Sequence, residues 1–142
     1  MRTARLSSIA AAAALALVAG VSTAAAAPVA PAAGGSTVKT VLSEFRVVTA
    51  VKSIKAGKVT FAIRNSGKLV HELVVVKTNL APAKLRKANG RADESRSVGE
   101  IGDVLAGKSG KLTLTLKPGK YVLLCNLPGH FAAGQWSAFT VK

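Results

Sequence analysis

Hydrophobic and polar residues alternate along two short stretches of the chain, 58–64 and 111–117. In the first stretch Val59, Phe61 and Ile63 occupy every second position, and in the second stretch three leucines do so. Successive side chains of a β-strand point to opposite faces, so this period of two predicts strands with one face in a hydrophobic core. Turn-forming Gly, Pro, Asn or Ser residues border both stretches.

Further stretches are rich in β-branched or other apolar residues and also predict strands: 38–48, 71–77, 121–125 and 136–141. The segment 78–110 shows no clear period, and we expect a short helix at 81–87 followed by a charged loop. At least six short strands with turns between them and little helix predict an all-β fold, a Greek-key antiparallel β-sandwich.

The N-terminal segment has the pattern of a secretory signal peptide. Arg2 and Arg5 precede an apolar run, and small residues build an Ala-x-Ala ending at Ala27. The strongly apolar run, 9–18, is shorter than the roughly 20 residues that span a membrane. We therefore expect cleavage of 1–27, export to the periplasm or secretion, and no stable membrane insertion of the mature protein.

The remaining chain predicts one domain. Residues 28–36 are Ala, Pro, Gly, Ser and Val, a composition that predicts a flexible linker. Residues 37–142 are enough for one hydrophobic core and not for two. We expect this domain to be a monomer.

The net charge of the chain indicates what kind of partner it would bind. Twenty Lys and Arg residues against six Asp and Glu residues give a formal net charge of +14, which favours an acidic partner protein. Nucleic acid is not expected, because aromatic residues are few and no Lys/Arg run resembles a nucleic-acid-binding motif. The segment 78–110 contributes a basic patch, which is either a docking surface or, as we favour, a solvated loop: Lys84, Arg86, Lys87, Arg91 and Arg96.

The chain has one cysteine, Cys125, and two histidines, His71 and His130. In an exported protein a lone cysteine cannot form an internal disulfide, which favours a role as a metal ligand. Five fully extended residues would place the α-carbons of Cys125 and His130 roughly 17 Å apart, but Pro128 and Gly129 between them allow the chain to turn back. A thiolate with two imidazoles and a weak fourth group is the ligand set of a blue-copper electron-transfer site.

These residues resemble the motif of the type 1 (blue) copper proteins, the cupredoxin family: an upstream His and a Cys-x4-His-x4 loop. The resemblance covers about 37–142, including Asn65-x-Gly67 ahead of His71. It implies a cupredoxin-like β-sandwich that binds one copper, cycling between Cu(I) and Cu(II), through His71, Cys125 and His130. Most of the family has Met at the weak axial position, where this chain has Gln135 and its only methionine is Met1.

The resemblance also implies a function. It indicates an electron carrier between exported redox partners, not an enzyme, with His130 as the electron port. The port would lie in an apolar patch: Leu127, Pro128, Phe131, Ala132 and Ala133. Many cupredoxins have Asn after the upstream His, where this chain has Glu72; its backbone N–H is expected to reach the thiolate and its carboxylate to be solvated, away from His71.

Three alternatives remain open on the sequence. A copper buffer or delivery protein would use similar ligands but exchange Cu(I). A Cys and two His with an open position also form a catalytic zinc pattern, although no histidine is left to act as a base. A metal-free, basic module that binds an acidic polymer is the third.

Overall fold

The computed structural model describes residues 34–142. The predicted signal peptide and most of the predicted linker lie outside these residues. One sheet has the strand order β2-β1-β4-β7 and consists of β1 (Ser36–Ser43), β2 (Arg46–Thr49), β4 (Gly57–Asn65) and β7 (Ser109–Leu116). The other has the order β3-β9-β8-β5-β6 and consists of β3 (Ser53–Ile54), β5 (His71–Lys77), β6 (Ser97–Val104), β8 (Gly119–Leu124) and β9 (Trp136–Val141).

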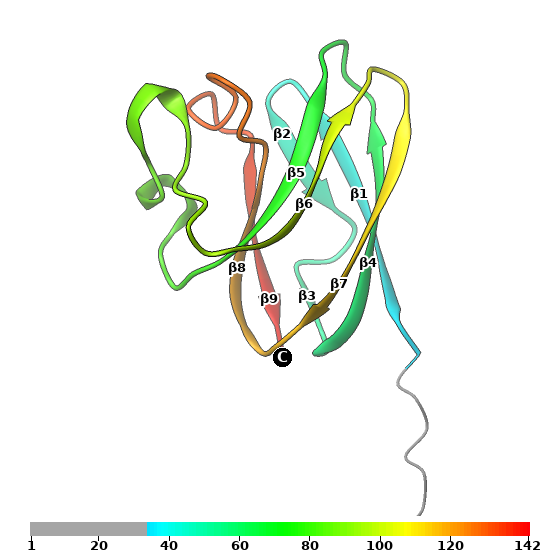
Figure 1. Cartoon of the computed structure of the whole chain (residues 1–142). Coiled ribbons are helices and arrows are strands. Elements are labelled where there is room, and N and C mark those ends of the chain that lie inside the picture. The colour runs from blue at the N-terminus through cyan, green and yellow to red at the C-terminus, as the bar shows by residue number, and fades with distance from the viewer. Residues whose placement is uncertain (1–33) are drawn as a thin grey trace, which may run out of the picture. The chain divides into compact units, whose positions relative to one another are not determined.

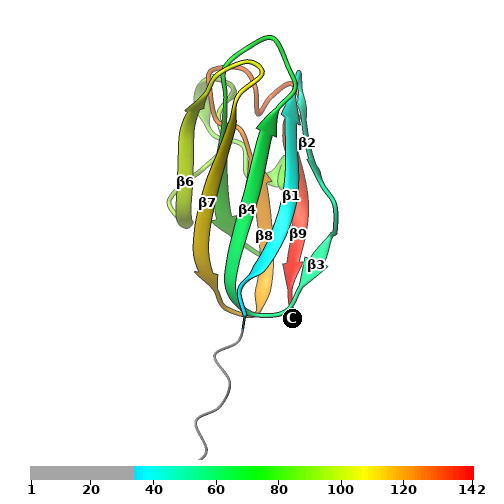
Figure 2. The same ribbon diagram turned by 90° about the vertical axis from the view of Figure 1, so that its right-hand side faces the viewer.

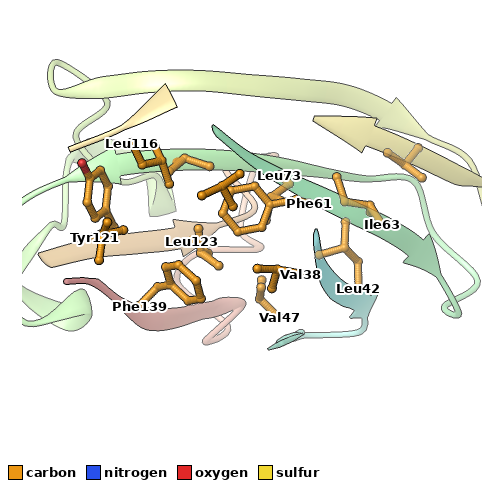
Figure 3. Close-up of a cluster of buried hydrophobic side chains, with 14 residues drawn as sticks. Val38, Leu42, Val47, Phe61, Ile63, Leu73, Leu116, Tyr121, Leu123 and Phe139 are labelled. Atoms are coloured by element: carbon orange, nitrogen blue, oxygen red, sulfur yellow. The ribbon is translucent and has the colours of Figure 1, made fainter. Parts of the chain in front are cut away.

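The two sheets pack face to face and enclose the main core (Figures 1, 2 and 3). Val59 and Phe61 are completely buried and Ile63 is 2% exposed, which confirms the face predicted from their alternation. Phe61 meets Phe139 of the opposite sheet edge to face, with ring centroids 5.7 Å apart. The sandwich fold is confirmed; the pairings of β1 with β4 and of β3 with β9 are parallel, and the others are antiparallel.

Strand β5 is buried on both faces. Leu73 and Val75 face the core between the sheets, whereas Val74 and Val76 face a second hydrophobic cluster on the outer side. The segment between β5 and β6 contributes Leu85 to that second cluster. The segment therefore covers part of the outer sheet face through Leu85, which is 6% exposed, while the five basic side chains of the predicted patch are exposed.

Two predicted elements differ from the structure, and strands β3 and β6 were not predicted. The stretch 38–48 is not one strand but β1 and β2, joined by a turn at residues 44–45. The expected helix at 81–87 is only a 3-10 turn, η1 (Pro82–Lys84), and a second turn, η2 (Ala88–Gly90), follows it. Strand β6 was not predicted, because Gly99 and Gly102 interrupt its alternation.

The connections β1–β2, β4–β5, β6–β7 and β8–β9 all lie at one end of the sandwich, the upper end in Figure 1. Every predicted site residue lies in or next to one of these connections. Among residues 34–142, no helix is long and apolar enough to cross a bilayer.

Candidate metal centre

The chain's only cysteine and both histidines converge at this end of the sandwich. His71 is the first residue of β5, Cys125 directly follows β8, and β5 and β8 are antiparallel neighbours, so the start of one lies beside the end of the other. One candidate ligand atom from each of His71, Cys125 and His130 lies within 4.8 Å of the others. We call these three residues the His–Cys–His site.

The β8–β9 loop folds back on itself to bring Cys125 and His130 together. The Cys125 N–H donates to the carbonyl of Gln135 at 3.0 Å, and the Gln135 N–H donates to the carbonyl of His130 at 3.1 Å. Gly129 has a φ of 81°, in the left-handed region that favours glycine. As a result, Sγ of Cys125 lies 3.3 Å from Nδ1 of His130, and the expected turn is present.

The ring of His71 has a different polar neighbour on each nitrogen. Nδ1 lies 2.9 Å from the amide nitrogen of Gln135, and Nε2 lies 3.3 Å from Oε1 of Glu44 in the β1–β2 turn. Nδ1 is therefore the nitrogen turned toward the centre of the site. Sequence reasoning did not find Glu44, because it lies 27 residues from His71 and carries no motif of its own.

Glu44 is an ionised carboxylate at neutral pH. It accepts hydrogen bonds from the backbone N–H groups of Leu69 and Lys68, both at 2.7 Å. The Leu69 donor, with smaller contributions from the backbone of Glu44 and Lys68 and from His71, lowers the pKa of Glu44 to about 2, although burial opposes the shift. The Glu44 side chain is 29% exposed, and its charge lies at the edge of the site.

Gln135 is completely buried beside His71. Its Oε1 finds no hydrogen-bond partner among residues 34–142. A buried polar atom left in this way costs about 1–3 kcal/mol. Turning the amide over would exchange its nitrogen and oxygen and direct the oxygen at the centre of the site, so the residue fits the predicted axial position. That Gln135 binds a metal stays a prediction.

Burial disfavours the charged forms of Cys125 and His71. Burial raises the pKa of the Cys125 thiol, although the neighbouring backbone at Glu72 and Leu127 opposes this rise. Burial also lowers the pKa of His71, and the charge of Glu44 opposes this. The expected hydrogen bond from the Glu72 backbone N–H to the sulfur stays a prediction.

The sequence suggested that the Glu72 carboxylate is solvated, but in the structure it has a hydrogen-bond partner. It accepts the Asn126 N–H at 2.7 Å, and burial raises its pKa. Asn126 in turn exchanges two hydrogen bonds with Ala92: its Oδ1 accepts the Ala92 N–H at 2.6 Å, and its Nδ2 donates to the Ala92 carbonyl at 3.2 Å. Asn126 thereby connects the β5–β6 segment to the residue after Cys125, a link that sequence reasoning missed.

His130 is the most exposed member of the His–Cys–His site. Phe45 packs edge-on against its ring, with centroids 5.1 Å apart. Of the predicted apolar patch, Pro128, Ala132 and Ala133 are exposed. Phe131 is not part of this surface, because it is 2% exposed and packs into the second hydrophobic cluster.

No protein-family model matches the chain. Among solved structures it is similar to reduced auracyanin from Roseiflexus castenholzii, with a TM-score of 0.60 and 23% identity, over 75% of this chain and 97% of that one. It is also similar to auracyanin A, a "blue" copper protein from Chloroflexus aurantiacus, with a TM-score of 0.55 and 20% identity, over 77% and 100% of the two chains. These are cupredoxins, and the chain has the cupredoxin fold, as the resemblance implied.

A curated relative shows similarity in sequence as well. The chain is 29% identical over 109 residues to the copper-resistant cuproprotein CopI of Rubrivivax gelatinosus. The matched region is 75% of this chain and spans 66% of the length of that relative.

Proposed function

We propose that the protein is a mononuclear blue-copper electron carrier. The observation that carries this proposal is the convergence of one thiol and two imidazoles within 4.8 Å beside the unpartnered amide oxygen of Gln135. One soft sulfur, two imidazole nitrogens and a weak axial group is the donor set that proteins use for blue copper. Bound there, copper would supply one-electron exchange between Cu(I) and Cu(II).

The chain's own residues would keep the ligand geometry constant during that exchange. His71 and Cys125 are completely buried, and each is attached to a central strand of the five-stranded sheet. Such burial excludes water from the ligands and limits rearrangement between oxidation states. His130 is partly exposed and would be the electron port.

We favour a carrier over an enzyme because both histidines of the chain belong to the His–Cys–His site, which leaves none to act as a base. Three surface hollows in the described part of the chain all touch Asn79, and no residue of the His–Cys–His site lines any of them. Export after signal cleavage, a monomeric state and an acidic redox partner complete the proposal, based on the N-terminal pattern and the net charge of +14.

The first test is the visible and EPR spectrum of purified mature protein loaded with Cu(II) and then reduced. We expect an intense thiolate-to-copper band with narrow hyperfine splitting that disappears reversibly on reduction. Cys125→Ser is the matched control and should lose the band while remaining folded. A colourless protein after full copper loading would overturn the proposal, and exclusive retention of Zn²⁺ would favour the zinc alternative.

Copper buffering or delivery is the second candidate, because the name of the similar CopI describes a copper-resistant cuproprotein. The two functions differ in kinetics. A carrier should retain copper through many redox cycles against a competing Cu(I) chelator, whereas a delivery protein should lose it in the reduced state.

A further inference from the structure

The carboxylate of Glu44 lies within contact distance of the His71 ring. Oε1 of Glu44 lies 3.3 Å from Nε2 of His71, whereas the other ring nitrogen, Nδ1, lies 2.9 Å from the amide nitrogen of Gln135. The chain has only six acidic residues among its 142, yet one of them faces the completely buried histidine.

The β4–β5 loop forms a cradle for this carboxylate. Its backbone N–H groups at Lys68 and Leu69 donate to Oε1 of Glu44. A Cβ at Gly67 would lie 2.5 Å from Oε1, so a side chain there would displace the carboxylate. Asn65 holds the loop in shape by accepting the Gly67 N–H at 2.8 Å and donating to the Leu69 carbonyl at 2.8 Å.

The chemistry of the pair fixes the proton on His71. An ionised carboxylate only accepts hydrogen bonds, so Nε2 of His71 must be the protonated nitrogen of the neutral ring. The lone pair then lies on Nδ1, which faces the centre of the site. A carboxylate on the far nitrogen also makes the imidazole a stronger donor, as in the carboxylate–histidine–metal arrangements of other proteins.

We propose that Glu44 is a positioning residue that holds His71 in the Nε2–H tautomer and makes the site prefer Cu(II) over Cu(I). The negative charge and the stronger donor both stabilise the higher oxidation state. This inference depends on the proposed copper function, and its experiment has one part that needs no metal.

The metal-free part is ¹⁵N NMR of the histidine rings in the wild-type apoprotein near neutral pH. We expect His71 to carry its proton on Nε2. A proton on Nδ1 in the wild type would overturn the inference, whatever any variant does. This result is independent of whether the protein functions with copper.

The second part compares Glu44→Gln with Glu100→Gln by protein-film voltammetry. Both changes remove one negative charge, but Glu100 is exposed on β6. Glutamine can still accept the Lys68 and Leu69 N–H groups, so the cradle should persist. Loss of such a partner of a metal-bound histidine typically changes metal affinity 10–100-fold.

A tenfold loss of the preference for Cu(II) raises the reduction potential by about 59 mV for one electron. We expect at least this rise in Glu44→Gln and a much smaller shift in Glu100→Gln. Equal potentials in copper-loaded wild type and Glu44→Gln would overturn the inference while leaving the carrier function intact. Failure of wild-type protein to form a blue site would instead overturn the proposed function.

Discussion

The Gln135 side chain places an amide against His71 where most cupredoxins have a thioether. Its nitrogen lies 2.9 Å from Nδ1 of His71, and its oxygen has no partner within residues 34–142. An amide oxygen is a harder donor than sulfur and stabilises Cu(II) relative to Cu(I). The identity of this one side chain should therefore help set the reduction potential.

We expect Gln135→Met to raise the reduction potential of the copper-loaded protein. The soft thioether would favour Cu(I), and it would also remove the buried unsatisfied oxygen. Potentiometry on wild type and variant at one pH measures the change. An unchanged potential would mean that Gln135 does not interact with the copper.

At this scale the three predicted ligands were accessible from the sequence because they are its only cysteine and histidines. Glu44 and Asn126 were not accessible in the same way. Their contacts join segments 27 and 34 residues apart, with His71 and Ala92 respectively, and depend on which turns meet at the end of the sandwich. Only the folded chain brings those turns together.

Among the elements, β5 connects the core to the site. Leu73 lies two residues after His71 and is completely buried between the sheets. Packing of this strand on both faces gives His71 a rigid attachment. The outer face depends on the β5–β6 segment, whose irregular sequence concealed its buried side chains.

Leu73→Ala should lower the free energy of unfolding of the apoprotein by about 2–5 kcal/mol, because truncation leaves a cavity in the core. Chemical denaturation measures this change. Val48→Ala on β2, where the side chain is 50% exposed, is the control and should change stability by no more than about 0.5 kcal/mol. Equal effects of the two variants would contradict the assigned packing.

Asn126→Ala should loosen the β5–β6 segment from the β8–β9 loop. The variant leaves the N–H and carbonyl of Ala92 without their partner, at a cost of about 1–3 kcal/mol. Hydrogen exchange at the Ala92 amide should accelerate before exchange in the β5 core does. Asn79→Ala, at an exposed position, is the control and should leave the exchange rates at Ala92 and in β5 unchanged. If exchange at Ala92 is also unchanged in Asn126→Ala, other contacts hold the segment.

Strand prediction succeeded where side chains alternate or form an apolar run, and it failed for β6, where glycines interrupt the pattern. In β6 a Cβ at Gly99 would lie 2.5 Å from a side-chain methyl of Leu114 in β7, and Gly99 has a φ of 154°, which other residues rarely adopt, so this position favours the residue that interrupts the pattern. The turn at residues 44–45 was hidden for another reason. β-Branched residues continue on both sides of it, and composition alone does not locate a reversal.

On the scale of the whole molecule, the few carboxylates in the described part of the chain bind mainly backbone N–H groups and so leave most of its positive charge unpaired. Glu44 and Glu72 accept backbone N–H groups next to the site, and the only Lys or Arg ion pair among residues 34–142 joins Lys87 to Asp93 at 3.6 Å. The basic side chains are therefore largely left to solvent. A positive field of this kind speeds encounters with an acidic partner.

Electron exchange with an acidic redox protein should slow as salt rises, because the Debye length shortens from about 30 Å at 0.01 M to about 3 Å at 1 M. Stopped-flow rates across that range measure the effect. A basic redox protein of similar potential is the control and should show the opposite trend. Rates independent of salt for both proteins would exclude electrostatic steering.

The arrangement of the chain ends has a practical consequence. β1 begins and β9 ends at the end of the sandwich opposite the β8–β9 loop (Figure 1). A carrier coupled to an electrode through Lys142 would thus present His130 outward, toward dissolved partners. Coupling through a cysteine introduced in the β6–β7 connection would instead bring His130 close to the electrode. The same domain can therefore be attached in either orientation.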